Sequence, residues 1–212
     1  MRIINAANGE RKRSWGNRES IASSLQPVAC SSKCGIGIES LRAAGYWLQA
    51  LYARVSRMKH PIAVLLHNIR SAHNVGAIFR TADAAGVSKI YLSGYTPTPI
   101  DRFKRPQKEI AKTALGAESF IPWEYAKTPG EIIKARRADG LQIVGVEQDK
   151  RSRDYRAFKP EKPTLLIFGN EVRGLSPQVR SMCDDLIHIP MFGKKESLNV
   201  ATTAGIILFS TL

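Results

Sequence analysis

From Pro61 to the C-terminus, short runs of aliphatic residues alternate with stretches in which apolar residues recur at helical spacing. Apolar runs of about four to eight residues are typical of buried strands, and apolar residues three and four positions apart are typical of helices. The pattern predicts strands at 62–66, 89–92, 120–122, 142–146, 164–168 and 186–189. It predicts helices at 75–85, 106–115, 129–138, 177–183 and 199–212. This alternation indicates an α/β domain with a mostly parallel sheet.

The first 60 residues have a different pattern. Residues 1–34 are rich in Arg, Ser, Asn and Gly and poor in large apolar side chains, so little apolar burial offsets the entropy of ordering them. We therefore expect a disordered basic extension over 1–34. Within 35–60, apolar residues at helical spacing predict one amphipathic helix that leads into the main domain. No repeat or low-complexity tract interrupts 61–212, which we treat as one domain.

Charge narrows the classes of partner. The chain has 212 residues, 32 of them Lys or Arg and 18 Asp or Glu, and its net charge is +14. Such a balance favours polyanions, which leaves RNA, DNA or an anionic membrane. Half of the excess charge lies in the first 60 residues, which fits either an RNA-contacting arm or a solvated tail. The apolar run at 204–212 is shorter than the roughly 20 residues that span a bilayer, so we expect a soluble protein with no membrane partner.

The cysteines bear on compartment and metal binding. There are three, Cys30, Cys34 and Cys183, and an odd, small number is typical of a reducing compartment, so we expect a cytoplasmic protein. The Arg- and Ser-rich start also fits an organellar transit peptide, and that alternative stays open. No second pair of Cys or His follows Cys30 and Cys34 at ligand spacing, so we predict no metal site.

Two loops on the first half of the domain carry candidate chemistry. Asn74 is placed to cap the helix after the first strand, where free backbone N–H groups attract anions. Arg80 lies further along this helix and, taken alone, is an ordinary surface cation that would pair with an acidic residue such as Asp83. Proline stiffens the segment 93–105, whose cations suit phosphates, so it is either a substrate-facing loop or a solvated connector. Its cations are Arg102, Lys104 and Arg105.

Three further loops follow the last three predicted strands, at 145–162, 169–174 and 190–197. Ligands of open α/β sheets lie beyond the carboxyl ends of the strands, so we expect these loops to form one crevice. The chain has no Walker loop, no strand followed by GxGxxG, no HExxH and no GxSxG. Their absence argues against the common nucleotide-phosphate, zinc-hydrolase and serine-hydrolase sites.

Each polar residue of the crevice allows two interpretations. Gly169 either lets a ligand lie against the backbone or supplies a positive φ in a tight turn. Asn170 and Glu171 either bind the neighbouring loop or face a ligand. Ser197 or Asn199 is well placed to cap the last helix. The residues taken one by one do not decide between these interpretations.

Taken together, the motifs resemble a known family. They are NVGAIFRTADAAGV from Asn74, KTALGAE from Lys112, IFGNEVRGLS from Ile167 and IPMFGKKESLNVATTAGI from Ile189. Over 61–212 the chain resembles the SpoU (TrmH-like) branch of the SPOUT-class RNA 2′-O-methyltransferases. The resemblance implies a doubly wound SPOUT domain, with helices on both faces of a mostly parallel sheet and a C-terminal trefoil knot. It also implies methyl transfer from S-adenosylmethionine to a ribose 2′-hydroxyl in tRNA or rRNA.

The family's pattern assigns roles to residues of this chain. The expected cofactor contacts are Gly169, Ile189, Met191 and Leu198. The expected catalytic set is Arg80, Asn74, Glu171, Ser197 and Asn199. Arg80 and the cations of 93–105 are expected to contact RNA. In the family the arginine is proposed as the general base, but a guanidinium pKa above about 12 resists deprotonation, so clamping a phosphate and stabilising a developing alkoxide is the easier role.

The resemblance also implies a homodimer with its active site completed near the subunit interface. The predicted last helix is apolar on nearly every side, which requires burial on several sides. Its small residues Ala201, Ala204 and Gly205 would allow a partner to approach closely. A catalytically inactive RNA-binding protein on the same scaffold is the alternative function. Residues 1–60 do not resemble the compact RNA-binding domain of rRNA-modifying members, so the choice between tRNA and rRNA stays open.

Overall fold

The computed structural model of the protein describes residues 60–101 and 103–212. The extension expected at 1–34, the helix expected within 35–60 and Arg102 lie outside the described residues. The strands are β1 (Ile62–His67), β2 (Lys89–Ser93), β3 (Trp123–Ala126), β4 (Gln142–Val146), β5 (Arg153–Asp154), β6 (Thr164–Phe168) and β7 (Asp185–His188). The helices are α2 (Ala72–Ala85), α3 (Lys108–Ala114), α4 (Ala117–Phe120), α5 (Pro129–Ala138), α6 (Pro177–Ser181) and α7 (Val200–Ser210), with a 3₁₀-helix η1 (Tyr155–Ala157).

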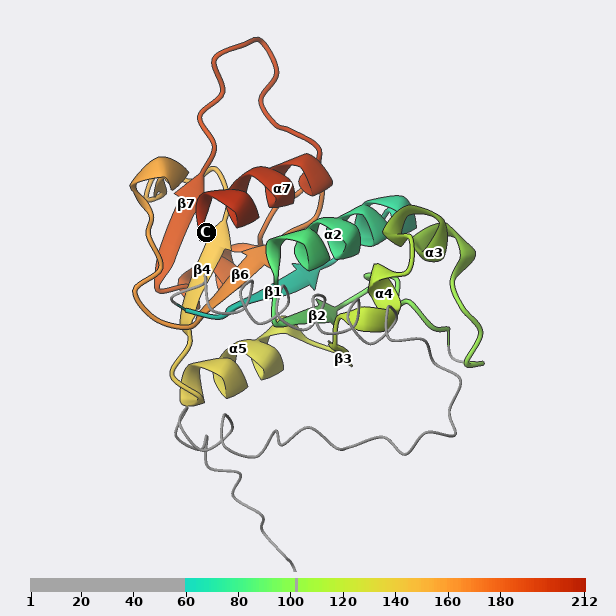
Figure 1. Cartoon of the computed structure of the whole chain (residues 1–212). Coiled ribbons are helices and arrows are strands. Elements are labelled where there is room, and N and C mark those ends of the chain that lie inside the picture. The colour runs from blue at the N-terminus through green and yellow to red at the C-terminus, as the bar shows by residue number, and fades with distance from the viewer. Residues whose placement is uncertain (1–59, 102) are drawn as a thin grey trace, which may run out of the picture. The chain divides into compact units, whose positions relative to one another are not determined.

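The described strands form one seven-stranded sheet in the order β3-β2-β1-β6-β4-β7-β5 (Figure 1). Every adjacent pair is parallel, which confirms the predicted parallel α/β sheet. In this order β6 lies between β1 and β4, and β4 lies between β6 and β7. The carboxyl ends of these four strands are therefore neighbours, and the loops that follow them meet at one edge.

Burial on both faces explains the continuous apolar runs, because helices cover each side of a parallel sheet. Along β1, Val64 and Leu66 pack into a cluster with residues of α2, α3 and α7. The alternate residues Ala63 and Leu65 pack against α5 and α6 on the opposite face. Figure 1 shows α2, α3 and α7 on one side of the sheet and α5 on the other. No helix in the described part of the chain has the length and apolarity to cross a membrane.

The predicted strand at 120–122 is wrong. Phe120 ends the short helix α4 with 76% of its surface exposed, and the strand begins at Trp123. The apolar run there includes one exposed ring, and Pro122, which has no N–H to donate to a ladder, directly precedes the strand. The helix α4 and the two-residue strand β5 were not predicted, because elements this short hold too few residues to show a period.

The start of α2 also differs from the prediction. Ser71, not Asn74, is the N-cap, and its hydroxyl accepts a hydrogen bond from the Asn74 N–H at 3.3 Å. Two residue types suited to capping lie three positions apart here, and the earlier one is used. The side chain of Asn74 is thereby released from capping and takes part in the site described next.

Candidate active site

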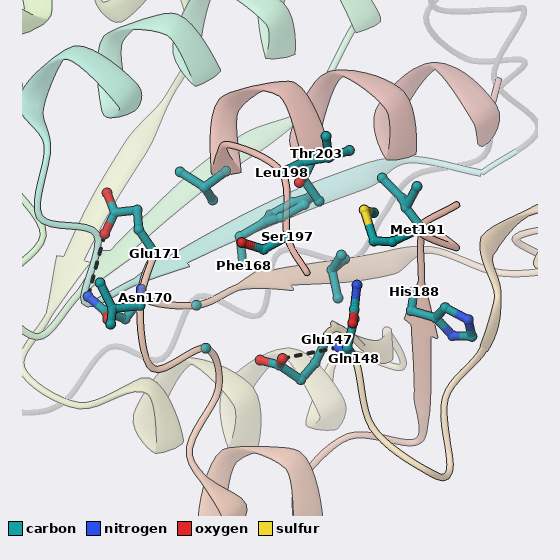
Figure 2. A pocket seen from close by; sticks show the side chains of 16 residues that line it. Glu147, Gln148, Phe168, Asn170, Glu171, His188, Met191, Ser197, Leu198 and Thr203 are labelled. Carbon is teal, nitrogen blue, oxygen red and sulfur yellow. Dashed lines mark hydrogen bonds between the residues drawn. The ribbon is translucent and has the colours of Figure 1, made fainter. Parts of the chain in front are cut away.

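A pocket lies at the carboxyl ends of β4, β6 and β7, between the loops that follow these strands (Figure 2). Its cavity volume is about 180 Å³. The lining residues are Val146, Glu147, Gln148, Phe168, Gly169, Asn170, Glu171, Val172, Gly174, His188, Ile189, Met191, Ser197, Leu198, Val200 and Thr203. The predicted meeting of the three loops is confirmed, and all four expected cofactor contacts line this pocket.

The chemistry of the lining contrasts with that of the whole chain. The net charge of the protein is +14, yet none of the residues that line the pocket is Lys or Arg. Apolar side chains such as Val146, Ile189 and Leu198 are joined by the carboxylates of Glu147 and Glu171. Carboxylates favour positive charge and disfavour phosphates. The pocket therefore suits a partly apolar ligand that carries positive charge.

The loop after β6 is a tight turn that returns on itself. A Cβ at Gly169 would lie 2.6 Å from the carbonyl carbon of Gly174, so only glycine permits this approach. Gly169 does not have a positive φ, so the turn interpretation of this residue is wrong in its detail; Gly174 is the residue with φ +61°. Asn170 secures the turn by accepting hydrogen bonds from the N–H groups of Val172 and Arg173.

Glu147, just after β4, holds the far end of the same turn. Its carboxylate accepts a hydrogen bond from the Leu175 N–H at 2.6 Å and another from the Gln148 N–H at 3.1 Å. The second bond is drawn in Figure 2. A side chain at Gly174 would collide with this carboxylate. The loops after β4 and β6 are therefore fixed to each other, and sequence reasoning missed Glu147 because no motif marks it.

The carboxylate of Glu171, from the loop after β6, lies at the start of α2. Its carboxylate accepts hydrogen bonds from the backbone N–H groups of Arg70 and Ser71 and, at 3.1 Å, from the amide of Asn74. Partial burial raises the pKa of Glu171, but the bonds from the Arg70 N–H, its own N–H, Asn74 and Ser71 outweigh it, so the pKa lies below its ordinary value. The helix start thus binds an anion that belongs to the protein itself.

The same network reaches the last helix. The Asn199 side-chain amide donates to Oδ1 of Asn74 at 3.1 Å. Oδ1 of Asn199 accepts a hydrogen bond from the Ala201 N–H at 2.7 Å, which makes Asn199 the N-cap of α7. Of the two caps considered from the sequence, Asn199 is the one used. Glu171, Asn74 and Asn199 therefore form one hydrogen-bonded chain that joins the starts of α2 and α7.

Ser197 and Leu198 come from the long segment between β7 and α7. Figure 2 shows both near Phe168, on the side of the pocket toward α7, whereas Met191 lies nearer His188. The hydroxyl of Ser197 has no hydrogen-bond partner among the described residues, and its surroundings are open to solvent. It is therefore available to a ligand.

A second network fixes the loop after β4. The Asp149 carboxylate binds the Arg180 guanidinium at 2.6 Å, and the Ser152 hydroxyl donates to the Asp149 carbonyl oxygen at 2.6 Å. Ser152 also lies 2.9 Å from Nδ1 of His188, at the pocket wall. These residues come from separate segments, so periodicity and motif spacing gave no signal for them.

The predicted cations behave differently from one another. Arg80 is exposed on α2, does not line the pocket, and its side chain contacts no acidic group among the described residues, so the suggested pair with Asp83 is absent. Lys104 is exposed and has φ +62°. Arg105 pairs with Asp101 at 2.8 Å. Within one chain, four of the five expected catalytic residues therefore lie at or next to the pocket, namely Glu171, Asn74, Asn199 and Ser197. Arg80 lies outside it.

Residues 60–101 and 103–212 contain no group of three His, Cys, Asp or Glu side chains that could hold a metal ion. Cys183 is half-buried, donates to the Val179 carbonyl at 3.3 Å, and burial raises the pKa of its thiol to about 11. At neutral pH the thiol is therefore protonated and a poor nucleophile.

Residues 61–209 match the family model described as the SpoU rRNA Methylase family. The chain belongs to this family. This SpoU-family chain is 32% identical over 162 residues to the tRNA (guanosine(18)-2′-O)-methyltransferase of Aquifex aeolicus, covering 76% of this chain and 74% of that protein. It is 30% identical over 201 residues to the 23S rRNA (guanosine-2′-O-)-methyltransferase RlmB of Vibrio parahaemolyticus, covering 84% and 78%.

A solved structure gives the same result for the fold. The AdoMet-bound rRNA methyltransferase from Sinorhizobium meliloti superimposes with a TM-score of 0.65 at 35% identity. The match covers 74% of this SpoU-family chain and 58% of that chain. The α/β fold with its parallel sheet is therefore shared, and the predicted family is confirmed.

Proposed function

We propose that this chain transfers a methyl group from S-adenosylmethionine to a ribose 2′-hydroxyl in tRNA or rRNA. The observation that carries the proposal is the hydrogen-bonded chain of Glu171, Asn74 and Asn199 beside a pocket without Lys or Arg. Membership of the SpoU family and relatives named as tRNA and rRNA 2′-O-methyltransferases support it. The two relatives act on different RNAs, so the proposal keeps both.

The donor set of the pocket fits S-adenosylmethionine. This molecule carries a sulfonium charge and an adenine ring, and the lining offers carboxylates and apolar side chains but no Lys or Arg. The residues that would hold it are Gly169, Ile189, Met191 and Leu198. When bound, it supplies a methyl group already activated by the sulfonium, so the protein must chiefly orient the accepting hydroxyl.

We assign that orientation to the polar network. Because hydrogen bonds keep the pKa of Glu171 low, this carboxylate is ionised at neutral pH and is a weak base. It is better suited to accepting a hydrogen bond and fixing Asn74 than to removing a proton. Asn199 and Ser197 face the same edge and would position the ribose and the cofactor.

Arg80 is assigned to the RNA. An exposed guanidinium without an acidic partner binds phosphate well, and its charge stabilises the alkoxide that develops as the 2′-hydroxyl loses its proton. Because Arg80 does not line the pocket of its own chain, the assignment requires a second copy to complete the site. We therefore also propose a homodimer, which uses the C-terminal helix region.

Two finer features belong to the same proposal. Family membership supports a trefoil knot formed by the segments after β6 and β7. Exposure of Lys104 and its unpaired ammonium support the RNA contact predicted for 93–105. The cytoplasmic location and the division at residues 34 and 60 stay predictions.

The test is incubation of the full-length protein with total RNA and methyl-labelled S-adenosylmethionine. A 2′-O-methyl group blocks hydrolysis of the adjacent phosphodiester, so label is expected in a dinucleotide that resists alkali and nucleases. Mapping this dinucleotide identifies the RNA and the nucleotide. A protein that binds RNA and S-adenosylmethionine but transfers no label would instead match the alternative, an inactive RNA-binding protein.

A further inference from the structure

An exposed tyrosine stands next to the proposed site. Tyr95 follows β2, at the carboxyl edge of the sheet, and 58% of its surface is exposed. Its neighbour Tyr125, at the end of β3, is 46% exposed and donates its hydroxyl to the Gly94 carbonyl at 2.8 Å. Isolated exposed apolar side chains are common on protein surfaces, so the position of Tyr95 needs an argument from its anchoring.

Both ends of Tyr95 are fixed. Its backbone N–H donates to the Asn68 side-chain carbonyl at 3.2 Å. Its hydroxyl accepts a hydrogen bond from the Asn170 amide at 2.9 Å. Asn170 is only 9% exposed, and the same amide donates to the Asn68 backbone carbonyl at 3.0 Å. The ring is thus held at its two ends, and the large exposed fraction of the residue leaves ring surface open to solvent.

Two residues next to Tyr95, Asn68 and Gly94, have left-handed backbone conformations. Asn68 has φ 58°, an uncommon conformation for a residue with a side chain. Gly94 has φ +67°, and a Cβ there would lie 1.9 Å from the Asn68 side-chain oxygen. Thr96 is 3% exposed and binds the Ile69 N–H at 3.1 Å and the Leu66 carbonyl at 3.1 Å. The turn that carries Tyr95 is therefore fixed to the loop after β1 by hydrogen bonds.

Tyr95 connects directly to the proposed catalytic residues. The Asn170 amide that binds its hydroxyl also lies 3.4 Å from the Glu171 carboxylate, as drawn in Figure 2. One side chain therefore separates the ring from the carboxylate to which we assign ribose orientation. A nucleotide with its ribose at Glu171 has a base, its own or its neighbour's, within reach of this ring.

One unpaired cation near the loop at 170–171 favours RNA. Arg70 is exposed and supplies a backbone N–H to Glu171, and its side chain has no partner among the described residues. Elsewhere on the surface, Arg137, Arg153 and Arg156 are paired with aspartates. Arg70 and Tyr95 are both hydrogen-bonded to the loop at 170–171. An unpaired cation and an open aromatic ring at one loop form a combination that binds single-stranded nucleic acid, because bases stack and phosphates pair with the cation.

The geometry points to Tyr95 as the platform on which a base of the RNA substrate stacks, next to the ribose that is methylated. This inference rests on the proposed function for the identity of the substrate. It adds a base-contacting residue to the segment 93–105, in which only the cations were predicted to contact RNA. It also explains why the hydroxyl of an exposed tyrosine is bound by a buried asparagine, since a stacking surface must be rigid to lose little entropy on binding.

The test measures RNA binding and base stacking by the full-length protein. The probe is a single-stranded RNA of roughly ten nucleotides that carries 2-aminopurine, whose fluorescence is quenched by stacking. Tyr95→Ala is expected to weaken binding roughly 5- to 150-fold, the equivalent of about 1–3 kcal/mol per stacked base, and to remove the quenching. The salt dependence of binding should not change, because Tyr95 carries no charge.

Two variants separate stacking from folding. Tyr95→Phe keeps the ring and should keep most of the affinity and the quenching. Phe120→Ala removes a ring that is 76% exposed and precedes β3, at the amino ends of the strands. This variant should bind RNA as the wild type does. The inference is overturned if Tyr95→Ala binds like Phe120→Ala. It is also overturned if Tyr95→Phe loses as much affinity, or if Tyr95→Ala changes the oligomeric mass or S-adenosylmethionine binding.

These results are separable from those on the proposed function. If the protein stacks the probe through Tyr95 but labels no RNA, the stacking inference holds and the proposed methyltransferase function is wrong. If Tyr95→Ala labels RNA and binds the probe as well as the wild type does, the methyltransferase function holds and the stacking inference is wrong.

Discussion

Glu171 and Arg80 are the two charged residues on which the proposed chemistry depends, and their surroundings are opposite. Glu171 is held by N–H groups at the start of α2, whereas Arg80 is exposed further along the same helix with no acidic partner in the described part of the chain. A carboxylate with its hydrogen bonds already made keeps its place during the reaction. A free guanidinium instead can move to a phosphate.

The low pKa of Glu171 makes stability depend on pH in one direction. Because the folded-state pKa lies below the ordinary value of 4.5, the ionised form stabilises the fold above that pH, and this stabilisation is lost as the pH falls through the folded-state pKa. Glu171→Gln is expected to lower the free energy of unfolding by about 0.5–1 kcal/mol at pH 7, the size of a helix-terminus effect. Urea denaturation at pH 7 and at lower pH measures it.

The difference between wild type and Glu171→Gln should shrink below pH 4.5. Glu161→Gln is the control, because Glu161 is exposed and its side chain has no partner in the described residues. A Glu171→Gln deficit that is constant with pH would show that the ionised carboxylate is not what stabilises this helix start.

Removing Arg80 should separate methyl transfer from cofactor binding. Arg80→Ala is expected to lower the rate roughly 100- to 1,000-fold, the effect of deleting one group that stabilises a developing negative charge. The affinity for S-adenosylmethionine should stay nearly unchanged, because Arg80 does not line the pocket. Transfer of label to RNA and calorimetric titration measure the two quantities.

Arg156→Ala is the matched control for Arg80, since Arg156 is an exposed arginine engaged by Asp154 at 2.5 Å. It should leave transfer near the wild-type rate. Wild-type turnover in Arg80→Ala would remove this residue from the catalytic set, whichever interpretation of its role is preferred.

At the scale of elements, the turn after β6 is the part of the site with the least room for change. A Cβ at Gly169 would lie 2.6 Å from the Gly174 carbonyl carbon and 2.8 Å from a Leu175 methyl. Gly169→Ala is therefore expected to lower the free energy of unfolding by about 1–3 kcal/mol, the usual cost of overpacking. It should also weaken S-adenosylmethionine binding, because the displaced turn lines the pocket. Gly193→Ala, where a Cβ would meet nothing within 4 Å, serves as the control for both measurements.

The elements were predictable from the sequence where they are long and buried. β4 and β6 lie at the predicted bounds, since their apolar runs end at polar or glycine residues. The strand at 120–122 failed because the apolar Phe120 is exposed in α4. The cap of α2 failed because Ser71 and Asn74 are both capping types, and only the tertiary contact with Glu171 distinguishes them.

The site was predictable as a set of loops but not as a set of contacts. Parallel topology places the loops after β4, β6 and β7 together, and the family motifs name Glu171, Asn74 and Asn199. The bonds of Glu147 to Leu175 and of Asn170 to Tyr95 join segments that are 28 and 75 residues apart. No local period or motif encodes such pairs, because they depend on how the strands are ordered.

At the scale of the whole molecule, the packing of α7 shows which of its residues are available to a second chain. Ala204 is fully buried, and Gly205 lies 3.6 Å, measured from a built Cβ, from the Thr81 methyl of α2. Ala204 therefore serves packing within the chain, whereas Ala201 and Gly205 are only partly buried. The close approach of a partner at these small residues stays a prediction. Phe209 in α7 and Leu212 after it are 53% and 56% exposed. These apolar side chains are available to contact another chain.

If the proposed dimer uses this end of the chain, Phe209→Glu should abolish it, because a charge cannot be buried there without a partner. Light scattering at micromolar concentration is expected to give twice the chain mass for the wild type and the single-chain mass for the variant.

Phe120→Glu, on an equally apolar and more exposed ring, should stay dimeric. Because Arg80 lies outside the pocket of its own chain, the monomeric variant should bind S-adenosylmethionine yet transfer little label. A monomeric wild type that transfers label, or a monomeric variant with full activity, would overturn the proposed dimeric site.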